Sequence, residues 1–155
     1  PWVSIAETVL GHGSRAFENL LKKSSPAYLQ DISDLHRTEA YVYSQMIAGK
    51  DACRFGEAKT AGLRELPHGI YKVSQYILGI RPEFDGLCID PCIPETLSGF
   101  TVTRHFRGAV YHIHVDNSAK SQKGIKTLLV NGTPVEGNMI PYQKDVTEYH
   151  VSAIM

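Results

Sequence analysis

The sequence predicts an α-then-β protein, with a helical first half and a small antiparallel, sandwich-like β domain after it. Apolar residues recur at helical spacing through much of the first 80 residues, and they alternate with period two after residue 100. Because helices precede strands, separate α and β layers are favoured over alternating βαβ units. We expect a helical domain at 1–80, a Pro-rich linker at 81–99 and a β domain at 100–155.

Four helical stretches are expected in the first half. The first covers residues 2–10 and ends at Gly11, and Ser14 is a suitable N-cap for the second. Further apolar stretches at helical spacing lie at 41–48 and 70–78. The apolar faces of the first pair are formed by Trp2, Ile5, Val9, Phe17, Leu20 and Leu21.

The second half carries strand and turn signals. Residues 100–106 and 109–115 alternate around the short turn Arg107-Gly108, which predicts a hairpin. Residues 125–130 form a third expected strand, and Asn131-Gly132 is a type I′ turn signal that leads to Val135. Two further short strands are expected at 139–140 and 150–154.

Composition excludes several classes of function. The 155 residues carry 16 basic and 16 acidic side chains, so no net charge favours nucleic acid or an anionic membrane. No apolar run is long enough to span a membrane. Cys53, Cys88 and Cys92 form no Cys-x-x-Cys pair, which indicates buried free thiols in a reducing cytosol.

Two small constellations have both a functional and a structural interpretation. His112 and His114 share one face of a strand, with His105 a candidate across the hairpin, but no third metal ligand is fixed by the spacing, so no metal site is predicted. Glu39 and Tyr43 lie four apart on an expected helix, where a carboxylate and a phenol suit sugar hydroxyls. An exposed Glu and a packed Tyr explain the same spacing.

Four ordered stretches together resemble the C-terminal end of an inverting disaccharide phosphorylase of the cellobiose and chitobiose phosphorylase family. They are SPAYLQDISDLHRTEAYVYSQMIAGKDACRFGEAK, SQYILGIRPEFDGLCIDPCIP, GFTVTRHFRGAVYHIHV and VNGTPVEGNMIP. The resemblance implies that residues 1–80 are the last helices of an (α/α)6 barrel, followed by the β domain. The start at Pro1-Trp2, without an initiator Met, fits a fragment.

The resemblance also implies a reaction. Family members cleave a β-linked disaccharide with inorganic phosphate, giving a sugar 1-phosphate with inversion and a free sugar, and they need no cofactor. Glu39 and Tyr43 match the family's Glu-Pro-Tyr-Val-Tyr stretch, whose Glu and final Tyr contact the acceptor sugar, although Ala40 replaces the Pro. Gln45 is a further candidate for the same pocket. The general acid and the phosphate-binding His lie upstream, so no catalytic or phosphate-binding residue is assigned here.

Residues 60–69 depart from the resemblance. Pro67 and Gly69 are the two poorest helix formers, and Leu63, Leu66 and Pro67 are expected to fit the surrounding helices poorly. The family has Asn-Ser-Trp-Leu-Thr-Gly-Thr-Ala-Ala-Trp here, and its Thr-Gly-Thr turn holds phosphate. One coding of that stretch is AAC AGC TGG CTT ACG GGA ACT GCC GCA TGG, and reading it one base later encodes Thr-Ala-Gly-Leu-Arg-Glu-Leu-Pro-His-Gly, which is Thr60 to Gly69. We interpret the segment as a frameshift that ends between Ile70 and Lys72. The alternative is a real loop whose sequence has diverged.

The sequence therefore predicts a fragment of a cytoplasmic glycoside phosphorylase that acts on a small disaccharide and phosphate. The fragment alone is expected to be inactive, and its parent to be a homodimer, as many family members are. The alternative is a non-catalytic carbohydrate-binding or structural module that is expressed on its own.

Overall fold

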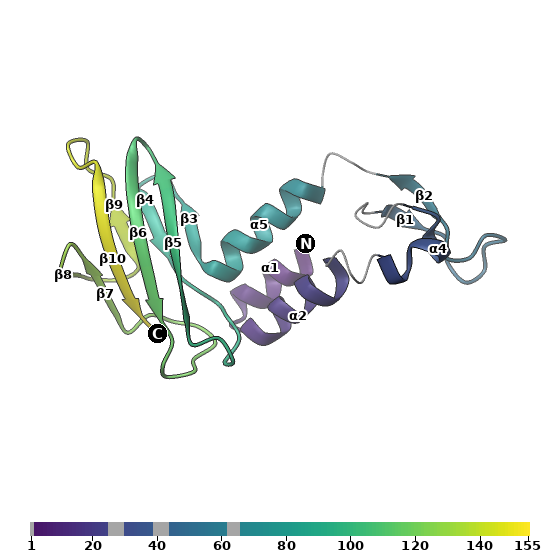
Figure 1. The fold of residues 1–155 in the computed structure, drawn as a ribbon, viewed down its shortest axis with the longest axis horizontal. Helices are drawn as coiled ribbons and strands as arrows, with labels where there is room; N and C mark the ends of the chain where they lie inside the picture. Colours follow the sequence, from purple (N-terminus) through teal and green to yellow (C-terminus); the bar gives the residue numbers. More distant parts are fainter. Residues whose placement is uncertain (1, 25–29, 39–43, 62–65) are drawn as a thin grey trace.

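The computed structural model describes residues 2–24, 30–38, 44–61 and 66–155. These residues form an elongated molecule with three parts in a row (Figure 1). Two β-sheets lie at one end, and the helices α1 (Trp2–Val9), α2 (Gly13–Ser24) and α5 (Leu66–Leu78) lie in the middle. The other end is a projecting unit made of α4 (Ser33–His36) and the paired strands β1 (Ser44–Ile47) and β2 (Ala58–Ala61).

The sheets follow the helices along the chain, so the α-then-β prediction is confirmed. One sheet has the order β5-β6-β10-β7-β8 and the other the order β3-β4-β9. Their bounds are β3 Ile80–Pro82, β4 Gly86–Ile89, β5 Gly99–Phe106, β6 Ala109–Asp116, β7 Thr127–Val130, β8 Thr133–Val135, β9 Met139–Pro141 and β10 Glu148–Ile154. Strand β4 and the last two residues of β3 thus lie inside the range 81–99 that the sequence assigned to a linker.

The expected hairpins form as predicted. Strands β5 and β6 pair antiparallel from Gly99 opposite Asp116 to Phe106 opposite Ala109. Strands β7 and β8 are joined by Asn131 and Gly132, whose φ angles of 50° and 78° are both positive, as a type I′ turn requires.

The prediction of a purely antiparallel β domain is wrong at one pairing. Strand β10 runs parallel to β6, with Tyr149 opposite Tyr111 and His150 opposite His112. A parallel pair needs a long connection that returns the chain to the same end of the sheet. The connection between β6 and β10 contains β7, β8 and β9 and is long enough to do so.

The prediction of a helix at 41–48 is also wrong for the residues of this range that the structure describes. Residues 44–47 form β1, which pairs antiparallel with β2. A short apolar run fits either period, and the preceding Tyr-Val-Tyr consists of residues that favour strands. Pairing with β2, which lies further along the chain, favours the strand over the helix.

At the junction between helices and sheets, side chains form hydrogen bonds with backbone groups at the ends of two helices. Helix α2 begins at Gly13, so Ser14 lies inside the helix and is not its N-cap. The amide N–H of Ser14 donates instead to Oε1 of Gln122 at 3.0 Å. The ammonium group of Lys123 donates to the carbonyl oxygen of Thr8 at 2.8 Å, at the C-terminal end of α1. The 117–126 loop thereby holds both helices against the sheets.

Helix α5 begins earlier than the sequence indicated. It starts at Leu66, so Pro67 is its second residue. Proline is tolerated in the first turn because its missing N–H has no partner there, so the penalty expected for an interior proline does not apply to this backbone. Val73 and Ile77 of the same helix are buried in the core that the two sheets share.

Two stacked tyrosines lie at the centre of this core. The rings of Tyr111 and Tyr149 are 4.4 Å apart between centroids and inclined by 4°. Both hydroxyl groups are buried and find no hydrogen-bond partner among the described residues. Burial, with a smaller contribution from Tyr149, raises the pKa of Tyr111 from its usual 10 to about 12.

The Tyr111→Phe variant is expected to remove part of the alkaline instability of the chain. Above pH 10 the unfolded chain releases the Tyr111 proton while the folded chain keeps it, so folding stability falls by about 3 kcal/mol between pH 10 and 12. Near pH 7 the substitution costs little, because the hydroxyl has no partner to lose. The measurement is the pH dependence of the urea midpoint. The exposed Tyr142→Phe is the control, and an equal response of both variants would contradict the assignment.

Candidate functional site

Three residues are predicted to contact the acceptor sugar: Glu39, Tyr43 and Gln45. Glu39 and Tyr43 lie outside the described residues. The backbone of Gln45 lies in β1, and its side chain is also outside the description. The assignment of these three residues therefore stays a prediction.

The projecting unit contains an ion-paired carboxylate. Glu57, which precedes β2, contacts Nη1 of Arg37 through Oε1 at 2.8 Å and Nη1 of Arg54 through Oε2 at 3.5 Å. The side chain of Glu57 is only 17% exposed, whereas both arginines are largely exposed. The pair with Arg37 connects the 44–61 hairpin to the chain two residues before Glu39, whereas the pair with Arg54 lies within the hairpin segment. Sequence reasoning missed this contact because its partners are 20 residues apart.

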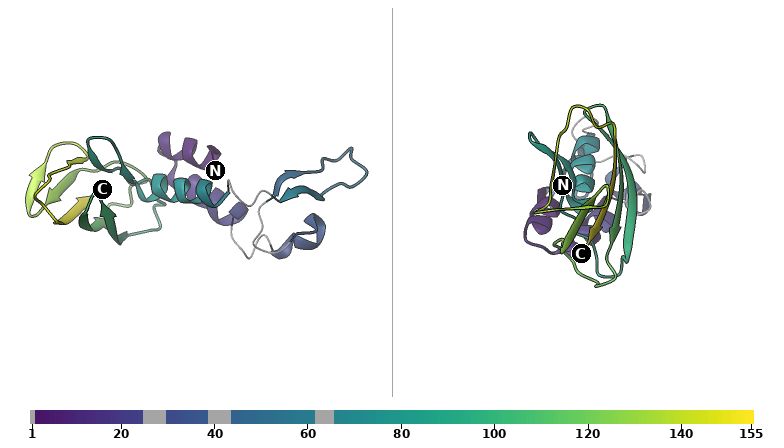
Figure 2. Two further views of the ribbon diagram at one scale, coloured as in Figure 1. Left: turned by 90° about the horizontal axis from the view of Figure 1, so that it is seen from above. Right: turned by 90° about the vertical axis from the view of Figure 1, so that its left-hand side faces the viewer.

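The projecting unit exposes apolar side chains. Four of them are largely accessible: Leu35, Met46, Ile47 and Phe55. The unit extends away from the sheets in both the front and top views (Figures 1 and 2).

Helix α1 turns its polar side inward. Ser4 and Thr8 are its buried residues, whereas Trp2 and Val9 in the helix and Leu10 directly after it are 83%, 64% and 68% exposed. At 100° per residue the three apolar side chains lie on one face, opposite Ser4 and Thr8. Of the apolar faces expected in α1 and α2, only Ile5, Phe17 and Leu20 pack partly against the core. The accessible stripe of α1 is typical of a helix that is buried in a larger body.

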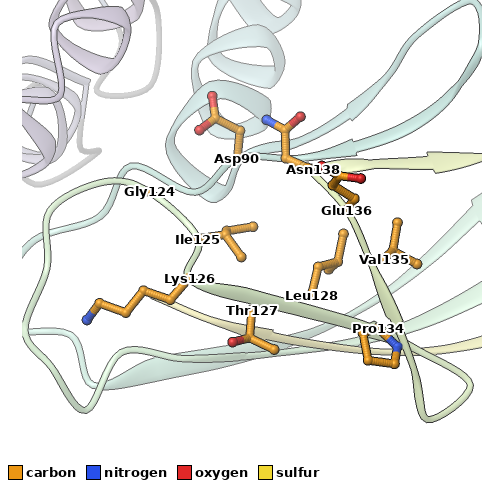
Figure 3. A pocket seen from close by; sticks show the side chains of 11 residues that line it. Asp90, Gly124, Ile125, Lys126, Thr127, Leu128, Pro134, Val135, Glu136 and Asn138 are labelled. Carbon is orange, nitrogen blue, oxygen red and sulfur yellow. The ribbon is translucent and has the colours of Figure 1, made fainter.

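A groove of about 500 Å³ lies beside β7 and β8 (Figure 3). Its floor is apolar, with Ile125, Leu128 and Val135, and Glu136 and Asn138 lie at its rim. Asp90, also at the rim, is already paired with Nη2 of Arg81 at 3.2 Å and with Nζ of Lys123 at 3.6 Å. The groove has room for a small ligand, but none of the predicted site residues lines it.

A second hollow, of about 360 Å³, lies on the outer face of the five-stranded sheet. His112, His114, His150 and Ser152 all line it, and we call it the histidine hollow. His105, a candidate from the sequence, lies opposite Val110 instead and does not line it. Within the described ranges, no three His, Cys, Asp or Glu side chains are arranged to hold a metal ion.

The cysteines carry free thiols in this structure. Cys88 and Cys92 are buried as expected, but Cys53 is exposed. Burial raises the pKa of both buried thiols, so they are protonated and unreactive near neutral pH. In the part of the chain that the structure describes, no helix is long and apolar enough to cross a membrane.

Comparison with known proteins divides the chain near residue 80. The model of the glycosyl hydrolase 94 superfamily catalytic domain matches residues 1–79. The model of the glycosyl hydrolase family 65 C-terminal domain matches residues 80–136.

Similar curated proteins are all longer. The N,N′-diacetylchitobiose phosphorylase of Vibrio proteolyticus is 41% identical over 142 residues, covering 91% of this chain and 18% of that protein. The enzyme of the same name from Vibrio furnissii is 40% identical over 156 residues, covering 100% and 19%. Solabiose phosphorylase of Paenibacillus borealis is 30% identical over 152 residues, covering 97% and 20%. The chain thus spans about a fifth of the length of these relatives. The match over 1–79 shows that the chain belongs to the glycosyl hydrolase 94 superfamily.

Proposed function

We propose that the chain is the C-terminal part of an inverting glycoside phosphorylase. The complete enzyme would cleave a β-linked disaccharide with inorganic phosphate and release a sugar 1-phosphate and a free sugar. Several relatives named as disaccharide phosphorylases support this proposal. N,N′-Diacetylchitobiose is the first substrate to test, because the two relatives at 40–41% identity carry its name.

The proposed reaction divides the chemistry between two parts of the enzyme. A carboxylic acid outside this chain protonates the glycosidic oxygen, and phosphate attacks the anomeric carbon from the opposite face as the C–O bond breaks. Glu39, Tyr43 and Gln45 would hold the acceptor sugar. The ion pair between Glu57 and Arg37 supports this assignment, because it connects the 44–61 hairpin to the segment that carries Glu39.

We also propose that residues 1–80 are the last helices of an (α/α)6 barrel, that 81–99 link them to the β domain at 100–155, and that the parent is a cytoplasmic homodimer. The outward apolar stripe of α1 supports the barrel, because neighbouring barrel helices would cover it. The change of matching family at residue 80 supports a boundary at that position. Free thiols fit a reducing compartment, and the homodimer is proposed from the family resemblance.

The isolated chain is expected to self-associate or to bind a hydrophobic dye through α1. Burial of apolar surface contributes about 25 cal/mol per Å², so a stripe that stays exposed to water leaves several kcal/mol of stabilising free energy unrealised. The Leu10→Lys variant should reduce dye binding, whereas Phe84→Ser, at a more exposed site between β3 and β4, should not. Fluorescence titration with light scattering is the measurement. A monodisperse unsubstituted chain that binds no dye would contradict the barrel assignment and favour an independent module.

The test of the proposed activity is the phosphate dependence of disaccharide consumption by the complete enzyme. Consumption of N,N′-diacetylchitobiose should require inorganic phosphate and stop when phosphate is removed. Consumption at the same rate in phosphate-free buffer would indicate a hydrolase and would overturn the proposal.

A further inference from the structure

The outer face of the five-stranded sheet brings two imidazoles and one carboxylate together. His112 on β6 lies directly opposite His150 on β10, and their rings stack with centroids 5.3 Å apart. Nε2 of His112 lies 3.2 Å from Oε1 of Glu148, and Nε2 of His150 lies 3.6 Å from the same oxygen atom. The two ring nitrogens therefore face one point.

The paired strands show which two histidines lie closest together, which the sequence pattern did not. From spacing alone, His112 and His114 form the obvious pair, two apart on one strand. Alternate residues on a strand are about 7 Å apart, whereas facing residues on adjacent strands are about 5 Å apart. The pair that faces across the strands is thus closer, and the carboxylate of Glu148 lies beside it and not beside His114.

We propose that His112 and His150 form a two-histidine chelate for a divalent transition-metal ion such as Ni²⁺, Cu²⁺ or Zn²⁺. Neutral imidazole is a preferred ligand of these ions. Two protein ligands suffice here, with water completing the coordination, which agrees with the finding that no group of three metal-binding side chains is arranged for an ion in the described residues. Chelation would require the two nearly parallel rings to turn so that both Nε2 lone pairs point at one ion.

The charge at the site favours a cation. Glu148 supplies one negative charge within 4 Å of both ring nitrogens, and its carboxylate would accept a hydrogen bond from a water molecule bound to the ion. No positively charged side chain lines the histidine hollow. A bound ion would also connect β6 to β10, so binding should stabilise this parallel pairing by linkage.

The test uses the full 155-residue chain without an affinity tag. Titration with Ni²⁺ at pH 7.5 gives the dissociation constant, and hydrogen exchange of β6 and β10 amides reports whether the ion connects the strands. His112→Ala and His150→Ala should each weaken binding by about tenfold or more, because either change removes the chelate. Both should also abolish the metal-dependent protection of the two strands.

His114→Ala is the matched control, because it removes a histidine from the same hollow. It should change the dissociation constant by less than about twofold. All three side chains face outward, so circular dichroism of each variant should match the unsubstituted chain. Binding that depends on His114 but not on His150, or protection that survives either chelate variant, would overturn the proposal. The result is independent of the phosphorylase proposal, since no substrate is involved.

Discussion

The isolated chain is expected to release no sugar 1-phosphate from N,N′-diacetylchitobiose or cellobiose. General acid catalysis contributes about 10² to 10⁴ in rate, and positioning of the reactants contributes several further orders of magnitude. The proposed proton donor and most of the phosphate site lie outside the chain, so both contributions are lost together. Phosphate-dependent release, followed by chromatography of the products, is the measurement.

A positive control is needed for this negative result. The N,N′-diacetylchitobiose phosphorylase of Vibrio proteolyticus, assayed under the same conditions, serves that purpose. Turnover by a clean preparation of the 155-residue chain would mean that the catalytic acid lies within it. The candidates would then be the carboxylates of the helical half, which could be tested one at a time.

Repair of the reading frame is expected to restore phosphate binding in the complete enzyme. One base restored before the Thr60 codon and one removed near the Lys72 codon would return the family stretch. Its Thr-Gly-Thr would then occupy positions 64–66, and α5 begins at Leu66. The free N–H groups and the dipole at a helix N-terminus favour an anion there, which supports the frameshift interpretation.

The matched control for the repair is the same complete enzyme with the sequence as it stands. Isothermal titration with inorganic phosphate should detect binding only after repair. The interpretation fails if error-free DNA encodes Thr60 to Gly69 as they stand and the unrepaired enzyme binds phosphate with equal affinity.

Local chemistry explains which parts of the fold were predictable. The turns at Arg107-Gly108 and Asn131-Gly132 are encoded by local sequence signals of a few residues, and both hairpins form as expected. The parallel partner of β10 and the strand character of 44–47 depend on segments that are remote in sequence. No periodicity within either segment encodes such a partner, so both were missed.

The candidate site shows the same division. Residue types and spacing drew attention to Glu39 and Tyr43, and to the face that carries His112. The contact of Glu57 with Arg37, and that of Glu148 with two imidazoles, required the paired strands to be in place. The inward orientation of Ser4 and Thr8 was also unpredictable, because an apolar stripe on a helix indicates burial without naming what buries it.

The most direct test of the central claim is the anomeric configuration of the product. The complete frame-repaired enzyme would be incubated with N,N′-diacetylchitobiose and inorganic phosphate, and the products followed by proton and phosphorus NMR. Inverting phosphorolysis of a β-linkage predicts an α-sugar 1-phosphate that accumulates in equal amount with the free sugar. A β-sugar 1-phosphate, or free sugars formed without any phosphate ester, would contradict the assignment.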